Sequence, residues 1–355
     1  GLSFGFKAGV WNIGAEGQYI MGAIFGAGLA LAFYPMESKL IFPLMIIAGA
    51  LGGFLWGMIP AFLKAKLNTN EILVSLMLVY VAESILASVS QGLLKNPDGY
   101  GFPGSRNLQK YESAANVEII SNSGMHWGVL FAFITVIFSY IVLTRHIQGF
   151  NIQLTGEAPR AAKFAGVNPT ANIVFCLGIS GTLAGLAGMF EVAGPSGQIT
   201  IEFNSGYGFT AIIVAFLGRL HPVGILLSGL LIALTYIGGE LAQLMLGLPG
   251  ASIQLFQGML LFFLLATDLF ANYRVKGRNK LIMDFSSINP ALLIASLMVS
   301  ATPILLAAIG EAVVEKSGVL NLGVEGMMIV GAVVGFIVAV NTDAPLLGFI
   351  CAAIV

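Results

Sequence analysis

The sequence has 355 residues, of which 57% are hydrophobic and 9% are charged, and its formal net charge is −1. Soluble domains carry roughly 25% charged residues, so this composition excludes an ordinary water-soluble surface. The near-zero net charge gives no indication of a nucleic-acid partner. Apolar segments alternate with short polar loops, which favours helices over a β-barrel. The predicted fold class is therefore all-α, a polytopic helical membrane protein surrounded by lipid.

A polar, glycine-rich hexapeptide opens an apolar segment twice. Residues 12–17 read Asn-Ile-Gly-Ala-Glu-Gly, and residues 321–326 read Asn-Leu-Gly-Val-Glu-Gly. A repeat of this kind implies two related units. Each copy places an amide and a carboxylate where a segment enters lipid, a costly position that suggests a use. The four residues concerned are Asn12, Glu16, Asn321 and Glu325.

Two interpretations of these polar groups remain open. In one, the four side chains line a solute pathway. In the other, the carboxylates of Glu16 and Glu325 cap the first-turn amides of the next helix, where negative charge is favourable. The two are compatible, because a rigid cap can shape a pathway.

Segments that are long and apolar enough to cross a membrane predict about ten spans. Residues 206–218 make up only roughly two-thirds of a span, which predicts a short or broken helix. Glycines four residues apart, as at Gly22/Gly26, Gly49/Gly53/Gly57 and Gly181/Gly185, predict closely packed helices. In chain order the other segments are roughly 15–33, 40–62, 71–93, 126–144, 171–192, 222–246, 252–271, 289–309 and 319–340, with a partial one from 345.

Cationic residues orient these spans. With 206–218 counted as a crossing, eleven Lys and Arg residues fall on the cytoplasmic side and Lys39, Lys95, Arg106 and Lys110 fall outside. The loop 94–125 then faces outward, either as an ordered docking surface or as a flexible connector. The eleven are Lys7, Lys64, Lys66, Arg145, Arg160, Lys163, Arg219, Arg274, Lys276, Arg278 and Lys280.

The topology fails between Lys280 and Lys316. If both are cytoplasmic, residues 281–288 would have to cross, yet eight residues of helix span about 12 Å against roughly 30 Å of hydrocarbon. Either 289–317 forms a re-entrant hairpin, or two proteins are joined. We favour a junction at Met283, which separates residues 1–282 from residues 283–355.

The cytoplasmic loop 155–169 predicts a short helix across the membrane face. Gly156 and Pro159 indicate its start, since proline suits a first turn, and Gly166 indicates its end. Ala161, Ala162 and Phe164 would be available to a partner.

Catalytic motifs are lacking. The sequence contains no phosphate-binding loop, no His-Glu-x-x-His and no Gly-x-Ser-x-Gly. Cys176 and Cys351 are expected to be buried apolar side chains rather than metal ligands or a disulfide. Carboxylates in or beside the spans would allow a second reading, a proton-coupled carrier. They are Glu71, Glu83, Glu191 and Glu240.

Three stretches together resemble the permease subunits of bacterial ABC importers for nucleosides and simple sugars, within the larger group of ribose and branched-chain amino acid permeases. They are residues 9–17 with their second copy 318–326, residues 156–167, and residues 206–219. The resemblance implies a multi-pass protein of the bacterial plasma membrane that is not itself an enzyme. It also implies an external solute-binding protein and ATP bound on a separate ATP-binding cassette subunit, with no cofactor in this chain. The coupling segment for that subunit would comprise Gly156, Glu157, Pro159, Ala161, Ala162, Phe164 and Gly166.

The resemblance also implies how the chain is divided into permease units. Such systems commonly pair two different permease subunits, so 1–282 would be a permease unit lacking its N-terminal helix or helices. Residues 283–355 would be the N-terminal part of a second, paralogous permease. We therefore expect a permease for nucleosides or a related ribose-like solute, with the proton-coupled carrier as the alternative. The sequence leaves open a purine or pyrimidine nucleoside, a flavin or a sugar.

Overall fold

The computed structural model describes residues 1–99, 101–120, 124–203, 206–246, 259, 263, 324–342 and 344–354. The chain divides into two compact units, Gly1–Tyr273 (unit 1) and Arg274–Val355 (unit 2). Several predicted features lie outside the described residues: the expected spans 252–271 and 289–309, the junction at Met283 and the side chain of Asn321. Within these spans only the single positions 259 and 263 are described.

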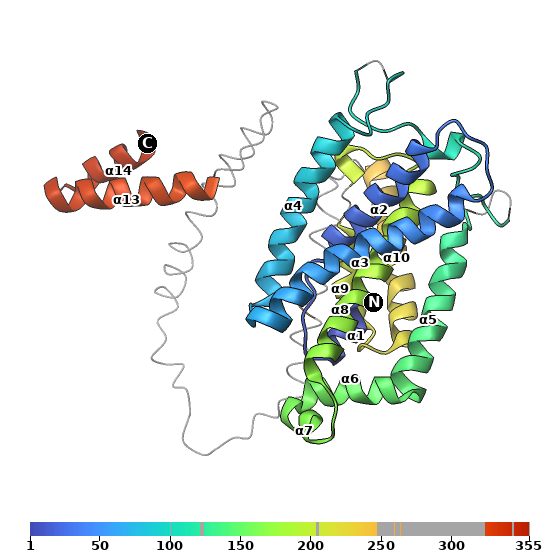
Figure 1. Ribbon diagram of the computed structural model, residues 1–355. Coiled ribbons are helices and arrows are strands. Elements are labelled where there is room, and N and C mark those ends of the chain that lie inside the picture. Colours follow the sequence, from blue (N-terminus) through green and yellow to red (C-terminus); the bar gives the residue numbers. More distant parts are fainter. Residues whose placement is uncertain are drawn as a thin grey trace. The chain divides into compact units, whose positions relative to one another are not determined.

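Unit 1 is built from helices (Figure 1). In its described residues the sole β contact is an isolated bridge between Glu118 and His126. The helices are α1 Leu2–Lys7, α2 Ala15–Ala32, α3 Ile41–Leu67, α4 Glu71–Gln91, α5 Trp127–Arg145, α6 Ile147–Glu157, α7 Pro159–Phe164, α8 Pro169–Ala193, α9 Tyr207–Leu217 and α10 Pro222–Leu246, with single 3₁₀ turns at Leu108–Lys110 and Ile201–Phe203.

Five described helices, α3, α4, α5, α8 and α10, are long and apolar enough to cross a membrane. Their bounds fall within a few residues of the predicted spans. Local chemistry explains several ends: the Asn70 side chain accepts hydrogen bonds from the first-turn amides of α4, and Asn168 does the same for α8. The predicted short helix is α9, with 11 residues.

The centre of unit 1 is the contact between α2, α3 and α8, with α4 and α5 on opposite flanks (Figure 1). Glycines bring these backbones together. A Cβ added to Gly53 of α3 would lie 2.6 Å from the Cα of Gly185 in α8, closer than real Cβ contacts. The predicted small-residue packing is therefore confirmed.

The long loop after α4 is tied to the same end of the bundle as the α2–α3 turn. The backbone N–H of Asn116 donates to the carbonyl of Ala193 (2.9 Å), and that of Ser38 donates to Oγ of Ser113 (3.0 Å). The guanidinium of Arg106 lies 4.4 Å from the ring centre of Tyr34. The described parts of this loop therefore make specific contacts, unlike a flexible connector.

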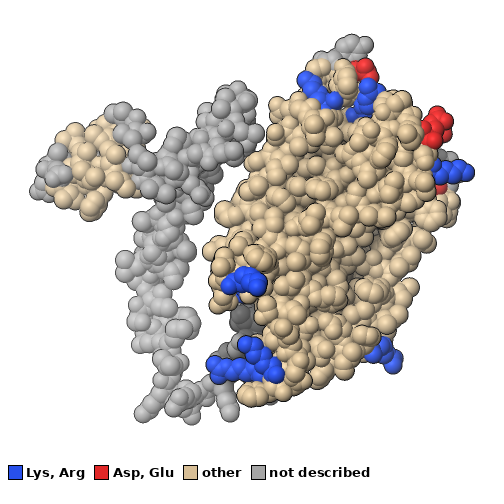
Figure 2. Space-filling model, viewed as in Figure 1, with Lys and Arg blue, Asp and Glu red and all other residues tan. Residues whose placement is uncertain are grey.

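Charge is concentrated at the two ends of unit 1. On the face shown in Figure 2, blue and red atoms gather at the upper end, blue atoms lie at the lower end and at one place on the left edge above it, and most of the surface between is tan. Many large apolar side chains of these helices are exposed, such as Leu51 on α3, Tyr80 on α4 and Ile137 on α5. This band suits contact with lipid.

Unit 2 contributes two described helices, α13 Val324–Thr342 and α14 Pro345–Ile354. They pack against each other at Gly331, where an added Cβ would lie 3.1 Å from the carbonyl oxygen of Ala352. The predicted spans from 319 and from 345 correspond to these helices.

Candidate functional site

The first copy of the hexapeptide covers the end of the α1–α2 connection and the first turn of α2, and it is held by a buried amide pair. The Nδ2 group of Asn12 donates to Oε1 of Gln18 (2.8 Å), and Nε2 of Gln18 donates back to Oδ1 of Asn12 (3.2 Å). Asn12 also donates to Oγ of Ser180 on α8 (2.9 Å) and accepts from the N–H of Gly14 (3.1 Å). Asn12 is fully buried, so these bonds offset the cost of placing an amide in the bundle.

The same segment is fixed to α4. The backbone N–H of Ile13 donates to Oγ of Ser75 (3.2 Å). A Cβ added to Gly14 would lie 2.7 Å from the carbonyl oxygen of Ser75, so glycine is needed for this approach. The non-helical backbone that opens α2 is therefore enclosed by protein, as backbone at membrane depth requires.

Glu16 caps a helix, and that helix is α9. Its Oε1 accepts the N–H of Gly206 (3.1 Å) and its Oε2 accepts the N–H of Gly208. Gly206 is the N-cap of α9 with φ +75°, a conformation that glycine adopts without strain. A Cβ added to Gly208 would lie 2.5 Å from the Cα of Glu16, so these backbones also touch.

Sequence reasoning located the polar groups and missed their partners. It named Asn12 and Glu16 but neither Gln18, Ser75 nor Ser180. The repeat concealed Gln18, because the position that matches it in the second copy is Met327. One signal could have identified Gln18: a buried amide such as that of Asn12 needs a partner, and Gln18 carries a second amide in the first turns of the following helix.

The remaining site residues of the repeat are less fully described. Asn321 lies outside the described residues, and Glu325 lies in the first turn of α13 with only its backbone described. Among the other carboxylates, Glu71 forms an ion pair with Lys64 (2.8 Å) at the adjoining ends of α4 and α3. Glu191 accepts a hydrogen bond from Ser196 (2.8 Å).

The segment predicted to couple with a partner forms the short helix α7, with Pro159 in its first turn. At its end the N–H of Gly166 donates to the carbonyl of Lys163 (3.1 Å) and that of Val167 to the carbonyl of Ala162 (2.9 Å), with Gly166 at φ +79°. This is a Schellman ending, so Gly166 ends the helix as predicted.

Two expectations for this segment are corrected. Gly156 and Glu157 form the last turn of α6, because Pro159 forces the preceding Ala158 into an extended conformation (φ −146°) and separates the helices. Ala162 is fully buried against its own chain and so is unavailable to a partner. Ala161 is exposed, and Phe164 is 94% exposed.

Helix α6 is connected both to α8 and to the segment just before the hexapeptide. Nδ2 of Asn172 on α8 donates to Oγ1 of Thr155 (2.9 Å), and Gln148 donates to Oδ1 of Asn172 (3.0 Å). A Cβ added to Gly156 would lie 2.9 Å from the backbone N of Gly9 and closer still to the Lys7 carbonyl. A continuous set of contacts therefore joins the α6–α7 bend to the segment that carries Asn12.

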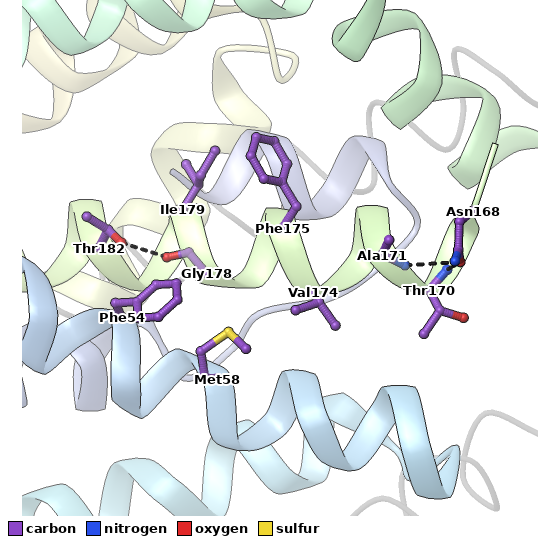
Figure 3. Close-up of a pocket in the computed structure, with 10 residues that line it drawn as sticks. All are labelled: Phe54, Met58, Asn168, Thr170, Ala171, Val174, Phe175, Gly178, Ile179 and Thr182. Carbon is purple, nitrogen blue, oxygen red and sulfur yellow. Dashed lines mark hydrogen bonds between the residues drawn. The ribbon is translucent and has the colours of Figure 1, made fainter.

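One hollow lies along α3 and α8 and has a volume of about 610 Å³ (Figure 3). Phe54 and Met58 of α3 lie toward Val174 and Gly178 of α8, whereas Phe175 and Ile179 extend from the other side of α8 in this view. Its hydrogen bonds are internal to α8: Asn168 accepts from the amides of Thr170 and Ala171, and Thr182 donates to the Gly178 carbonyl. This apolar lining offers a polar solute little.

A second cavity, of about 500 Å³, is open on one side and lies between α1, α2, α8, α9 and α10. Ala15 of the hexapeptide and Ser180, the partner of Asn12, line it, whereas Asn12 and Glu16 themselves do not. Its wall also includes Tyr19, Tyr207 and Tyr236. In the part of the chain that the structure describes, no group of three or more His, Cys, Asp or Glu side chains is placed to hold a metal ion.

The sequence matches the family described as branched-chain amino acid transport system permease component over residues 1–265 and 293–355. The glucose ABC transporter permease protein TsgB13 of Haloferax volcanii is 34% identical over 280 residues, which cover 76% of this chain and 72% of that protein. The guanosine ABC transporter permease protein NupP of Bacillus subtilis is 28% identical over 268 residues, covering 74% and 75%. The nucleoside ABC transporter permease protein NupB of Lactococcus lactis is 29% identical over 272 residues, 74% of each. No solved structure matches the chain.

Proposed function

Because this chain belongs to the family of branched-chain amino acid transport system permease components, we propose that it is the membrane-spanning part of an ATP-driven importer of nucleosides or a related ribose-like solute. It is a multi-pass protein of the plasma membrane and a transport component rather than an enzyme. The solute class is supported by relatives named for guanosine, nucleosides and glucose. Membership of this family favours ATP-driven transport over the proton-coupled carrier.

The observation that carries the proposal is the helix α7. It is held on the bundle by the buried Ala162 and presents Ala161 and Phe164 outward. An exposed phenylalanine on a short helix at the charged end of a membrane bundle suits insertion into an apolar groove of a soluble partner. We assign that partner as the ATP-binding cassette subunit, which would bind and hydrolyse ATP, so that this chain carries no cofactor.

Movement of α7 would reach the transport pathway through Gly156. The chain backbone at Gly156 lies against Lys7 and Gly9, only three residues before Asn12. Asn12 and Glu16 would then shape the pathway from behind, by positioning α8 and α9, and Asn321 and Glu325 would do so in the second unit.

Two different permease subunits would form the complete pathway. The family match is interrupted at residues 266–292, and the compact units separate at Tyr273 and Arg274. Both observations support residues 1–282 as one permease unit and 283–355 as the start of a second. Intact mass of the product purified from cells tests whether one polypeptide contains both.

The external loop would receive a solute-binding protein. Its backbone bonds to Ala193, Gly197 and Ile199 fix it to the ends of α8 and of the segment that follows. A loop held in one shape can present a docking surface at little cost in conformational entropy.

Uptake by membrane vesicles that contain the complete transporter tests the function. We expect uptake to stop when ATP is depleted and to continue when the proton gradient is collapsed; the reverse result would contradict the proposal. Ala161→Glu should abolish uptake with the bundle still folded, because a carboxylate would be desolvated at the interface. Ala171→Glu is the control, since this exposed position lies in the first turn of α8, where negative charge is tolerated.

A further inference from the structure

The cavity between α1, α2, α8, α9 and α10 has the size and position of a solute site. Its volume of about 500 Å³ lies within the roughly 300–1,000 Å³ of small-molecule sites. It lies beside the N-terminal turn of α9, an 11-residue helix too short to cross a bilayer alone. Broken helices of this kind commonly border the solute site of a transporter.

The charges around the cavity disfavour an anionic solute. The N-terminal amides of a broken helix would ordinarily attract a carboxylate. Here the carboxylate of Glu16 already accepts the amides of Gly206 and Gly208. Among the described residues that line the cavity there is no Lys, Arg or His side chain, and the one charged side chain is Glu191. The carboxylate of an amino acid would therefore lose water on entering without gaining a cationic partner, which is unfavourable.

The same wall suits a neutral solute that carries a ring and hydroxyl groups. The ring centres of Tyr207 and Tyr236 lie 5.9 Å apart, and those of Tyr19 and Tyr207 lie 6.1 Å apart. The Thr210 hydroxyl donates to the Gly206 carbonyl (3.2 Å), so the Tyr236 hydroxyl donates to Thr210 (2.9 Å), and the oxygen of each can accept a further hydrogen bond from a solute hydroxyl. The Tyr19 side chain is 4% exposed, and its hydroxyl has no hydrogen-bond partner within the described residues. Buried hydroxyls of this kind normally have a partner.

We infer that this cavity binds the ribosyl or glycosyl hydroxyls of a neutral solute during its passage and discriminates against amino acids. The inference rests on the proposed function and adds the chemical class that the permease itself accepts. Tyrosine faces would hold the base or the sugar ring, while Thr210, Tyr236 and Tyr19 would pair with solute hydroxyls.

The test uses the complete transporter in proteoliposomes with a saturating amount of its solute-binding protein. The probes are guanosine and 2′,3′-dideoxyguanosine, which lacks two ribose hydroxyls, with leucine as the amino-acid comparison. Thr210→Val and Tyr236→Phe each remove a hydroxyl with little change in volume. Tyr80→Phe, on an exposed position of α4 outside the cavity, is the matched control.

We expect each cavity variant to lower guanosine uptake by about 2- to 10-fold, the loss of one hydrogen bond, with a smaller change for dideoxyguanosine. A purely structural role would lower uptake of both nucleosides equally, and that result would overturn the inference. Leucine uptake comparable to that of guanosine would also overturn it. Failure of the unmodified transporter to import any neutral solute with ATP would instead contradict the proposed function.

Discussion

Replacing Glu16 separates its capping role from a direct role in the pathway. Its carboxylate accepts two backbone amides of α9, those of Gly206 and Gly208, and the side chain is fully buried. A hydrogen bond to a charged group contributes about 1.5–3 kcal/mol. Glu16→Ala removes two, so the free energy of unfolding should fall by about 3–6 kcal/mol. Glu16→Gln keeps one acceptor oxygen and turns an amide donor toward the second N–H. It should therefore lower the free energy of unfolding by less than Glu16→Ala does.

The assay is unfolding of the detergent-purified transporter, followed by uptake normalised to the amount of folded protein. We expect the midpoint of unfolding to be highest for the unmodified protein, lower for Glu16→Gln and lowest for Glu16→Ala. Uptake should fall in the same order. Glu112→Gln, an exposed carboxylate in the loop after α4, serves as the control and should leave both unchanged. If Glu16→Ala unfolds like the unmodified protein while uptake is lost, the carboxylate acts in transport and the capping argument is refuted.

Two further predictions follow from the close approach of glycine backbones, and the first uses Gly28→Ala as its comparison. Gly53→Ala places a Cβ 2.6 Å from the Cα of Gly185, so α3 and α8 must separate by about 1 Å to restore ordinary contact, at a cost of about 1–3 kcal/mol in the free energy of unfolding. Gly28→Ala in α2 meets open space and should raise that free energy by up to about 1 kcal/mol. Equal shifts in the melting temperatures of the two variants would contradict this. Gly156→Ala should push α6 away from Gly9 and lower the solute imported per ATP hydrolysed while hydrolysis continues; an unchanged ratio would show that this contact transmits nothing.

The sequence by itself determined the class of the protein and the positions of most described helices. Composition required a lipid environment, and the lengths of the apolar segments placed α3, α4, α5, α8 and α10 to within a few residues. Short-range signals predicted the short α9 and the glycine that ends α7. These signals succeed because hydrophobic length and caps depend on residues close together in the chain.

Tertiary structure alone decided what the polar residues do. Glu16 caps a helix 190 residues away, Asn12 bonds to Ser180 of α8, and Ala162 is buried by its own chain although its neighbour Ala161 is exposed. A repeated motif shows which polar residues recur in the sequence. It does not predict their hydrogen bonds, because each bond depends on the position and direction of both partners. Where α8 and α9 pass beside the start of α2 is set by the packing of glycine surfaces along whole helices, and local patterns in the sequence carry no such information.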